Sequence, residues 1–180
     1  MIVPVETFNA YSGNYEDSPE AVALKQAFLE SAEEIISSYL SYRPEEKLYA
    51  DVIITGTNAP HLLLPSRSIK ELISLSIDGK LISSSEFLLM DDRIRFKDHH
   101  RVFPKGENIV VSYRGGWSLD EMPAVIRLSI MRIATLMLSE TNGNIGLTGK
   151  SFADNSRTFI NYSNYKKYLE PLDGLRIVRF

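Results

Sequence analysis

The spacing of apolar residues changes twice along the chain, and this change constrains the fold more than any other feature of the sequence. Over residues 18–43 apolar side chains recur every three or four positions, which is the period of a helix. Over residues 48–114 they alternate with polar ones, as in strands. Residues 123–140 are apolar nearly all round, which is typical of a buried helix. The sequence therefore predicts an α+β fold, a small bundle of three main helices with an antiparallel β region of five or six short strands inserted between the first and second long helices.

The first helix has clear start and stop signals. Ser18 is a favourable N-cap, and Pro19 brings the preset φ angle of a first helical residue. Arg43-Pro44 ends the helix, because a residue before proline disfavours the α conformation. We expect one apolar face to be buried and the opposite face, which includes Lys25, to be solvated. The expected buried face consists of Ala21, Leu24, Phe28, Ala32, Ile35, Tyr39 and Tyr42.

Within the β region, two dipeptides predict tight turns. Asp78-Gly79 is typical of a two-residue hairpin, and Asp91-Asp92 predicts a second turn. Before the first turn, Ile73, Leu75 and Ile77 alternate with serines, so these three side chains are expected on one buried face.

The remaining segments complete one predicted domain over residues 1–180. Residues 1–17 show no clear period and are predicted to form an extended N-terminal arm. Residues 141–156, rich in Gly, Asn and Ser, predict a flexible loop, and residues 157–170 predict the third main helix. Residues 171–180 form a C-terminal tail that ends in the alternating, strand-like hexapeptide L-R-I-V-R-F.

Composition excludes several classes of function. A net charge of −3 argues against a protein that grips duplex DNA, which requires many Lys and Arg contacts to phosphate. The chain has no cysteine, so it has no disulfides, thiolate metal sites or cysteine nucleophile. The N-terminus lacks the pattern of a secretory signal, and Arg127 and Arg132 interrupt the most apolar segment, so we expect no membrane span. We expect a location in the cell interior or in a particle assembled there.

The segment G-N-I-G-L-T-G-K-S, residues 143–151, is similar to a phosphate-binding loop. Such a loop requires G-x-x-x-x-G-K-[ST], and here Gly143 lies one residue too early because position 144 is Asn144. A true loop of this kind also follows a parallel strand and opens a helix, whereas this segment follows a predicted buried helix. Nucleotide binding stays an alternative, and a connecting loop is the favoured interpretation.

Other candidate sites are weaker. His99-His100 would point to opposite faces of a strand, so the pair favours a turn over a metal site. Asp91-Asp92 is better explained as a turn than as a pair of magnesium ligands. We therefore expect no catalytic residue, no metal site and no cofactor.

The order of these features resembles the head–tail connector, or adaptor, proteins of long-tailed bacteriophages. The matching features span about residues 18–170. They are the helix ending in E-I-I-S-S-Y-L-S-Y-R-P, Leu64-Pro65 and Ile69 before Leu72, the Ile77-Asp78-Gly79 hairpin, Phe87-Leu88-Leu89, the strand ending in Tyr113 before Gly116, and Pro123-Ala124 opening an apolar helix.

The resemblance implies a structural virion protein that is not an enzyme. It implies a homo-oligomeric ring of about a dozen copies beneath the portal of the DNA-filled head. The ring would join the portal protein to a stopper or tail-completion protein and extend the channel through which genomic DNA passes without sequence recognition. Location in the virion, after assembly in the host cytoplasm, is implied as well. A generic protein-interaction module is a further alternative.

We expect the contacts with the portal and with neighbouring copies in the segments with the least internal reason to be ordered, namely the loop and the tail. The C-terminal hexapeptide could add as a strand to the edge of a neighbour's sheet. The candidate contact residues are Gly143, Ile145, Leu147, Lys150, Phe152, Leu175, Arg176, Ile177, Val178, Arg179 and Phe180.

Overall fold

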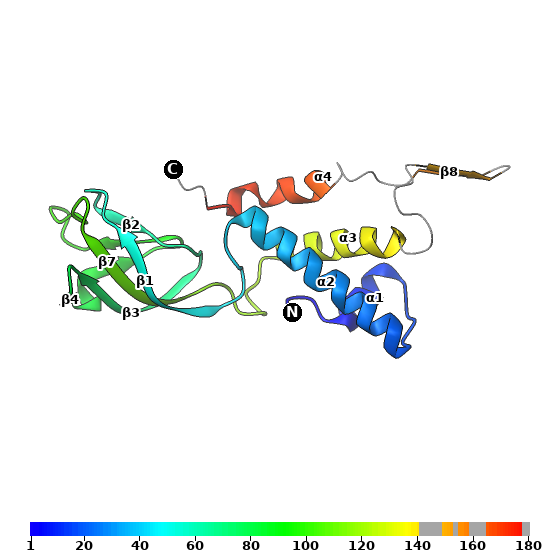
Figure 1. Ribbon diagram of the computed structural model, residues 1–180, viewed down its shortest axis with the longest axis horizontal. Helices are drawn as coiled ribbons and strands as arrows, with labels where there is room; N and C mark the ends of the chain where they lie inside the picture. The colour runs from blue at the N-terminus through cyan, green and yellow to red at the C-terminus, as the bar shows by residue number, and fades with distance from the viewer. Residues whose placement is uncertain (141–148, 153–154, 159–164, 178–180) are drawn as a thin grey trace. The chain divides into compact units, whose positions relative to one another are not determined.

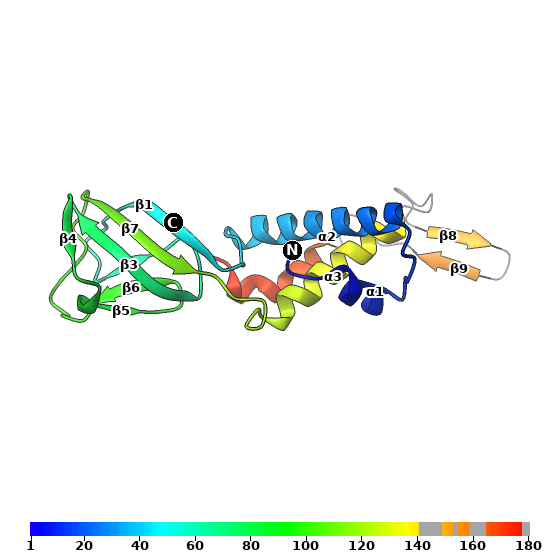
Figure 2. The same cartoon turned by 90° about the horizontal axis from the view of Figure 1, so that it is seen from below.

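The computed structural model of the chain describes residues 1–140, 149–152, 155–158 and 165–177, the second and third of these ranges by their backbone alone. These residues divide into two compact units, shown in Figure 1 and Figure 2. The helical unit comprises Met1–Leu40 and Pro123–Arg176. The β unit comprises Ser41–Met122 and includes Ile177, so it is inserted between the two halves of the helical unit.

Three helices of the helical unit share one apolar core. Helices α1 (Val5–Ser12) and α2 (Pro19–Leu40) precede the β unit, and α3 (Ala124–Glu140) follows it. Helix α2 packs along α3, and α1 contacts both of them. The buried core residues are Ile2, Val3, Val5, Phe8, Leu29, Ala32, Ile36, Leu40, Ile126, Ile130, Ile133, Ala134 and Leu172.

The described chain after α3 begins with a hairpin of β8 (Gly149–Phe152) and β9 (Asn155–Thr158), which pair antiparallel. It ends with a short helix, α4 (Tyr165–Leu169), and the 3₁₀ helix η3 (Glu170–Leu175). The prediction of a helix over residues 157–170 is therefore wrong at its start, since Arg157 lies in β9. The predicted loop over residues 141–156 contains strand β8, and its residues 141–148 and 153–154 lie outside the described residues. Gly, Asn and Ser in this stretch hide the alternation by which strands are recognised.

Helix α1 corrects the prediction that residues 1–17 form an extended arm. Pro4 immediately precedes the helix, and Gly13 ends it in the left-handed region with a φ of 69°. The N–H group of Gly13 donates to the carbonyl oxygen of Asn9 at 2.9 Å, which closes the last turn. Proline at the start and glycine after the end form a helix signal that does not depend on periodicity. Val5 and Phe8 are both buried, so this segment is part of the core.

Helix α2 begins as predicted. The Ser18 hydroxyl oxygen accepts a hydrogen bond from the N–H group of Ala21 at 3.3 Å. The helix ends at Leu40 instead of residue 43, because Ser41 adopts a φ of 68°. The buried face differs from the prediction and is formed by Lys25, Leu29, Ala32, Ile36 and Leu40.

This difference has a sequence cause, since two neighbouring rows of α2 are apolar. Phe28 and Leu29 are adjacent, as are Ile35 and Ile36, so the spacing alone allows either row to be buried. Of the predicted stripe within α2, Ala32 is the one residue that is fully buried, and Leu24 is 41% exposed.

Helix α3 starts after Pro123, as predicted. The N–H group of Ile126 donates to the carbonyl oxygen of Pro123 at 3.0 Å. Ser129, a polar residue in this largely apolar helix, is buried. Its hydroxyl group donates to the carbonyl oxygen of Tyr168 at 2.8 Å, so this hydrogen bond fastens the C-terminal segment to α3.

The β unit contains seven strands in two antiparallel sheets, one more than the upper limit of the prediction. The four-stranded sheet has the order β1-β7-β3-β4, and the three-stranded sheet has the order β2-β6-β5. The strands are β1 (Lys47–Thr55), β2 (His61–Leu63), β3 (Ile69–Ile77), β4 (Lys80–Ile82), β5 (Phe87–Leu89), β6 (Arg93–Phe96) and β7 (Asn108–Gly115), with the 3₁₀ helix η1 (Ser84–Glu86) before β5.

The two sheets cover one core from opposite sides, with β5 and β6 beneath β1, β3 and β7 in Figure 2. Phe87, Phe96 and Phe103 form an aromatic cluster in this core, and their ring centroids are 4.7–6.1 Å apart. The buried core residues are Leu62, Leu64, Leu72, Leu75, Phe87, Ile94, Phe96, Phe103, Ile109, Val111 and Tyr113.

Both predicted turns of the β unit are present. Asp78 and Gly79 have φ values of 46° and 78° and connect β3 to β4, as a two-residue hairpin requires. The expected buried face of β3 is wrong in one place. Leu75 is buried, but Ile73 is 49% exposed, because the register shifts between Leu72 and Ser74.

The segments that enter and leave the β unit are hydrogen-bonded to each other. The N–H group of Trp117 donates to the carbonyl oxygen of Pro44 at 2.9 Å, and that of Glu46 donates to the carbonyl oxygen of Trp117 at 3.0 Å. Gly116, with a φ of 103°, lies at this crossing, where a Cβ atom would be 2.3 Å from the carbonyl oxygen of Glu45. Only glycine fits at this position. The hydrogen bonds join the first and last segments of the β unit, so its base, where the chain enters and leaves, is closed.

Candidate interaction surfaces

The outer side of the four-stranded sheet carries a row of four residues that has an exposed apolar side chain at each end. Ile53 pairs with Val110, Val110 pairs with Ser76, and Ser76 pairs with Leu81, so the four side chains lie side by side across all four strands. Ile53 is 69% exposed and Leu81 is 79% exposed. We call this row, Ile53, Val110, Ser76 and Leu81, the long-sheet face. Apolar rows of this kind on a sheet mark sites of protein association.

The outer side of the three-stranded sheet carries a second apolar surface with a basic character. Leu63 pairs with Arg93, while Arg95 pairs with His61 on one side and with Leu88 on the other. Leu63 and Leu88 are 44% and 45% exposed. We call these five residues, His61, Leu63, Leu88, Arg93 and Arg95, the short-sheet face.

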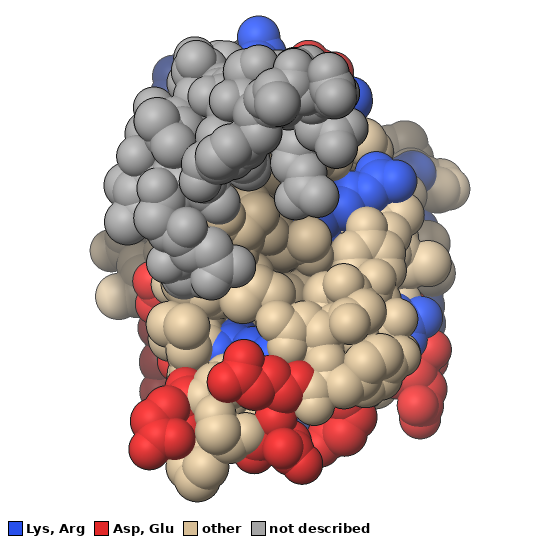
Figure 3. Space-filling view, turned by 90° about the vertical axis from the view of Figure 1, so that its right-hand side faces the viewer, with Lys and Arg blue, Asp and Glu red and all other residues tan. Residues whose placement is uncertain are grey.

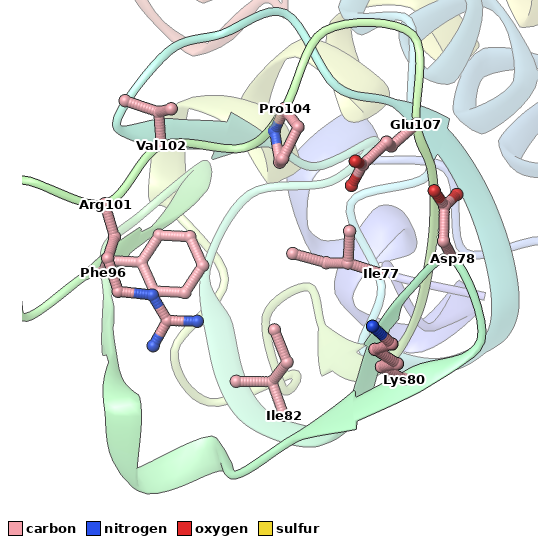
Figure 4. A pocket seen from close by; sticks show the side chains of 9 residues that line it. All are labelled: Ile77, Asp78, Lys80, Ile82, Phe96, Arg101, Val102, Pro104 and Glu107. Carbon is pink, nitrogen blue, oxygen red and sulfur yellow. The ribbon is translucent and has the colours of Figure 1, made fainter.

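A hollow of about 340 Å³ opens at the β3–β4 end of the β unit. Ile77, Ile82 and Phe96 form its apolar part, as Figure 4 shows, with Asp78 and Glu107 on one side of the opening and Arg101 on the other. The Arg101 guanidinium lies 4.2 Å from the centroid of the Phe96 ring and pairs with Glu86. The carboxylate of Asp78 accepts a hydrogen bond from the N–H group of Asn108 at 3.2 Å. These interactions fix the β3–β4 hairpin on one side of the hollow and the Arg101 side chain on the other. The hollow has room for one side chain of a partner.

The first two helices present an acidic surface. Residues 1–40 contain seven acidic residues and one basic residue, Lys25, which is only 1% exposed. Every charged side chain that α1 and α2 expose is therefore negative. Figure 3 shows acidic side chains gathered along one edge at the end of the helical unit. Such a surface repels the phosphates of DNA and attracts basic partners.

The ammonium group of Lys25 binds α1 and the connection between α1 and α2. The prediction that Lys25 is solvated is therefore wrong. The ammonium group donates to the side-chain oxygen of Asn9 at 2.8 Å and to the carbonyl oxygens of Asn14 and Glu16 at 2.9 and 2.6 Å. These bonds use all three donors of the group. Lys25 is therefore a structural residue, and it lines a surface hollow of about 320 Å³ beside Leu24.

Shifted pKa values in the β unit have structural causes. Burial raises the pKa of Tyr42 well above its usual range. The hydrogen bond from Arg93, 2.6 Å from the nearer oxygen, lowers the pKa of Asp92. A hydrogen bond from Lys70 lowers the pKa of the exposed Glu121. Each of these shifts is thus explained by burial or by a hydrogen bond within the β unit.

The residues predicted to contact partners fall into three groups. The structure describes Leu175, Arg176 and Ile177, and it describes the backbone of Lys150 and Phe152 in strand β8. Gly143, Ile145, Leu147, Val178, Arg179 and Phe180 lie outside the described residues.

The start of the predicted tail is anchored to the protein, which corrects the expectation of a strand-like segment from residue 175 onward. Leu175 is the last residue of η3, and Ile177 is 8% exposed. Arg176 donates from Nε to the carbonyl oxygen of Tyr39 at 3.1 Å and places its guanidinium 4.6 Å from the centroid of the Tyr39 ring. Residues 175–180 do alternate in sequence between apolar and basic residues. Residues 175 and 176 nevertheless do not form a strand, because Leu175 belongs to η3 and Arg176 is bonded to α2.

The alternation in the sequence did not predict the two sheet faces, because it identifies the buried positions of a strand and not the role of the outward ones. Ile53, Leu81 and Leu88 lie at strand positions that point to solvent, where polar side chains are usual. Apolar residues at outward positions of several neighbouring strands are the sequence signal that indicates these faces.

The two alternative chemical sites gain no support. Gly149, Lys150 and Ser151 lie in strand β8, whereas a phosphate-binding loop would place them at the start of a helix. His99-His100 forms a turn, as predicted. The described part of the chain contains no group of three or more acidic or histidine residues that could hold a metal ion. Among its helices, none is both long enough and apolar enough to cross a membrane.

No protein-family model and no curated protein matches the sequence. Solved structures do match the fold. A chain in the neck of an empty gene transfer agent (GTA) particle, computed with C6 symmetry, aligns with 99% of this chain and 91% of its own length, with a TM-score of 0.61 and 14% identity. A chain in the virion of a native GTA particle gives the same coverage and TM-score with 15% identity.

A third match is a chain in the neck of a native GTA particle computed with C12 symmetry. It covers 96% of this chain and 89% of its own length, with a TM-score of 0.54 and 14% identity. At such low identity these matches establish the fold alone. The chain thus has, over almost its whole length, the fold of protein chains found in GTA particles, two of them in the neck.

Proposed function

We propose that the chain is a structural subunit of the neck of a phage or phage-like particle and has no catalytic activity. One observation carries this proposal, the fold shared over 99% of the chain with a chain of a GTA neck. Since the match spans both the helical unit and the β unit, it concerns the whole arrangement of elements and not one common motif.

Within the neck, the chain would form a ring of about a dozen copies that joins the portal to the tail and extends the DNA channel. Two observations support the ring. The related necks were computed with C6 and C12 symmetry, and the β unit exposes apolar residues on both of its sheets. The acidic surface of α1 and α2 would suit a wall along which DNA passes without being gripped.

The loop and the tail remain the proposed docking segments for the portal and for a stopper or tail-completion protein. Because residues 175–177 contact the folded chain, deletion of the whole hexapeptide would remove structural contacts as well. The informative deletion begins at residue 178. It should reduce portal binding while leaving the urea midpoint of the isolated protein unchanged.

Electron microscopy of lysates tests the main proposal. Deleting the gene from the phage or prophage that carries it should yield DNA-filled or leaking heads separated from finished tails. Supplying the intact gene on a plasmid should restore joined particles. Normal infectious particles in the deletion strain would refute the proposal.

Calorimetry with ATP and GTP tests the alternative that residues 143–151 bind a nucleotide. This alternative predicts saturable binding that Lys150→Ala removes. A generic interaction module predicts a fixed small oligomer that does not associate with particles.

A further inference from the structure

We propose that neighbouring copies in the ring pack head to tail through their β units, with the long-sheet face of one copy against the short-sheet face of the next. This inference rests on the proposed function, because it assigns the contact that would close the ring. It names a second copy of this chain as the occupant of both faces.

The geometry of the β unit supports this arrangement. The two sheets cover one core, so their outer sides point in opposite directions, as the two layers in Figure 2 show. A ring of identical subunits requires two different surfaces on each copy, one for the neighbour on each side. A two-fold dimer would instead need a single patch that matches itself. The β unit has two unlike apolar faces, as a head-to-tail contact between copies requires.

The chemistry of the two faces is complementary. The long-sheet face presents Ile53 and Leu81 around the small side chain of Ser76, which permits close approach of a partner's leucines. Near this row, the exposed Asp51 adds a negative charge, and its carboxylate is oriented by the Ser112 hydroxyl at 3.1 Å.

The short-sheet face places Leu88 directly beside Arg95 and Leu63 directly beside Arg93. Arg93 is already paired with Asp92 of its own chain. The leucines would therefore meet the apolar row while Arg95 would meet Asp51 of the neighbour, and opposite charges at such a contact fix its register. Arginine is well suited to this position because its fork of donors matches a carboxylate.

The absence of cysteine from the chain allows a direct test by crosslinking. The double variant Leu81→Cys/Leu88→Cys places one thiol on each face, at positions that are 79% and 45% exposed. Particles carrying a tagged version would be purified, treated with a bismaleimide and denatured, and the tag would be detected on a gel. Head-to-tail packing predicts a ladder at successive multiples of the 20.4 kDa chain that extends beyond the dimer.

Three control variants make the result specific. The two single variants, Leu81→Cys and Leu88→Cys, should stay monomeric, because a head-to-tail contact brings unlike faces together. The pair Ile53→Cys/Leu81→Cys, with both thiols on the long-sheet face, should give no ladder either. Unchanged fluorescence of Trp117 would show that the β unit of each variant is folded.

The outcomes distinguish this inference from the function on which it rests. Tagged protein present in joined particles but without a ladder would overturn the face pairing and leave the neck function standing. Dimers from a single variant would show two-fold packing and would also overturn it. Tag absent from intact particles would refute the neck function, and the inference would fall with it.

Discussion

Replacing Lys25 with methionine removes an ammonium group and keeps a side chain of similar length and bulk. In the folded chain this group is buried and donates three hydrogen bonds, to Asn9, Asn14 and Glu16, at distances of 2.6–2.9 Å. The acceptors belong to α1 and to the connection between α1 and α2. The substitution therefore tests whether one buried cation fastens the first helix to the second.

The expected loss follows from those three bonds. Hydrogen bonds to a charged group contribute about 1.5–3 kcal/mol each, and the acceptors would lose their donor. The cost of burying the charge is removed at the same time, and this offsets part of the loss. We expect the free energy of unfolding of the helical unit to fall by about 3–5 kcal/mol.

Two spectroscopic signals separate the two units during urea unfolding. Circular dichroism at the helical wavelength reports on the helical unit, while the single tryptophan, Trp117, lies in the β unit. Lys25→Met should lower the midpoint of the first signal and leave the second largely unchanged. Lys167→Met is the matched control, because this lysine of α4 is exposed. A helical midpoint equal to that of the control would refute the structural role of Lys25.

Two further predictions concern the β unit. Burial raises the pKa of Tyr42, so above about pH 10 the unfolded chain ionises while the folded chain stays protonated. The stability from this group is present below that pH and is lost as the pH rises, so the urea midpoint from Trp117 fluorescence should fall less in Tyr42→Phe than in the wild type. Gly116→Ala should cost about 3 kcal/mol, because its Cβ atom would meet the carbonyl oxygen of Glu45. Gly106→Ala, at a φ of 83° with no atom within 4 Å, should cost only about 1 kcal/mol, and equal losses in urea unfolding would contradict the clash argument.

Features set by a few neighbouring residues could be predicted from the sequence. The cap at Ser18, the start of α3 after Pro123 and the turn at Asp78-Gly79 all depend on local backbone preferences, and all three are present. The order of helix, strands and helix followed from periodicity for the same reason.

Burial could not be predicted as well, because it is decided by packing between distant segments. The spacing in α2 allowed either of two apolar rows to face inward, and contacts with α3 selected the row of Leu29 and Ile36. Lys25 has a charged side chain, and its burial is possible because three oxygen atoms of residues 9–16 accept its hydrogen bonds. The candidate surfaces were missed for a related reason, since Ile53 and Leu81 differ from core residues only in the direction in which the strand points them.

The closed base of the β unit has a consequence for the order of folding. Helices α2 and α3 pack together although residues 41–122 separate them in sequence. Bringing the ends of an unstructured chain of about 80 residues together costs entropy that grows with the logarithm of its length. Once the bonds between Pro44 and Trp117 have formed, only a few free residues remain on each side, which lowers that cost by about 2 kcal/mol. We therefore expect the inserted unit to close before α2 and α3 pair. Gly116→Ala, which weakens this closure, should then slow the pairing of two helices that the substitution does not touch.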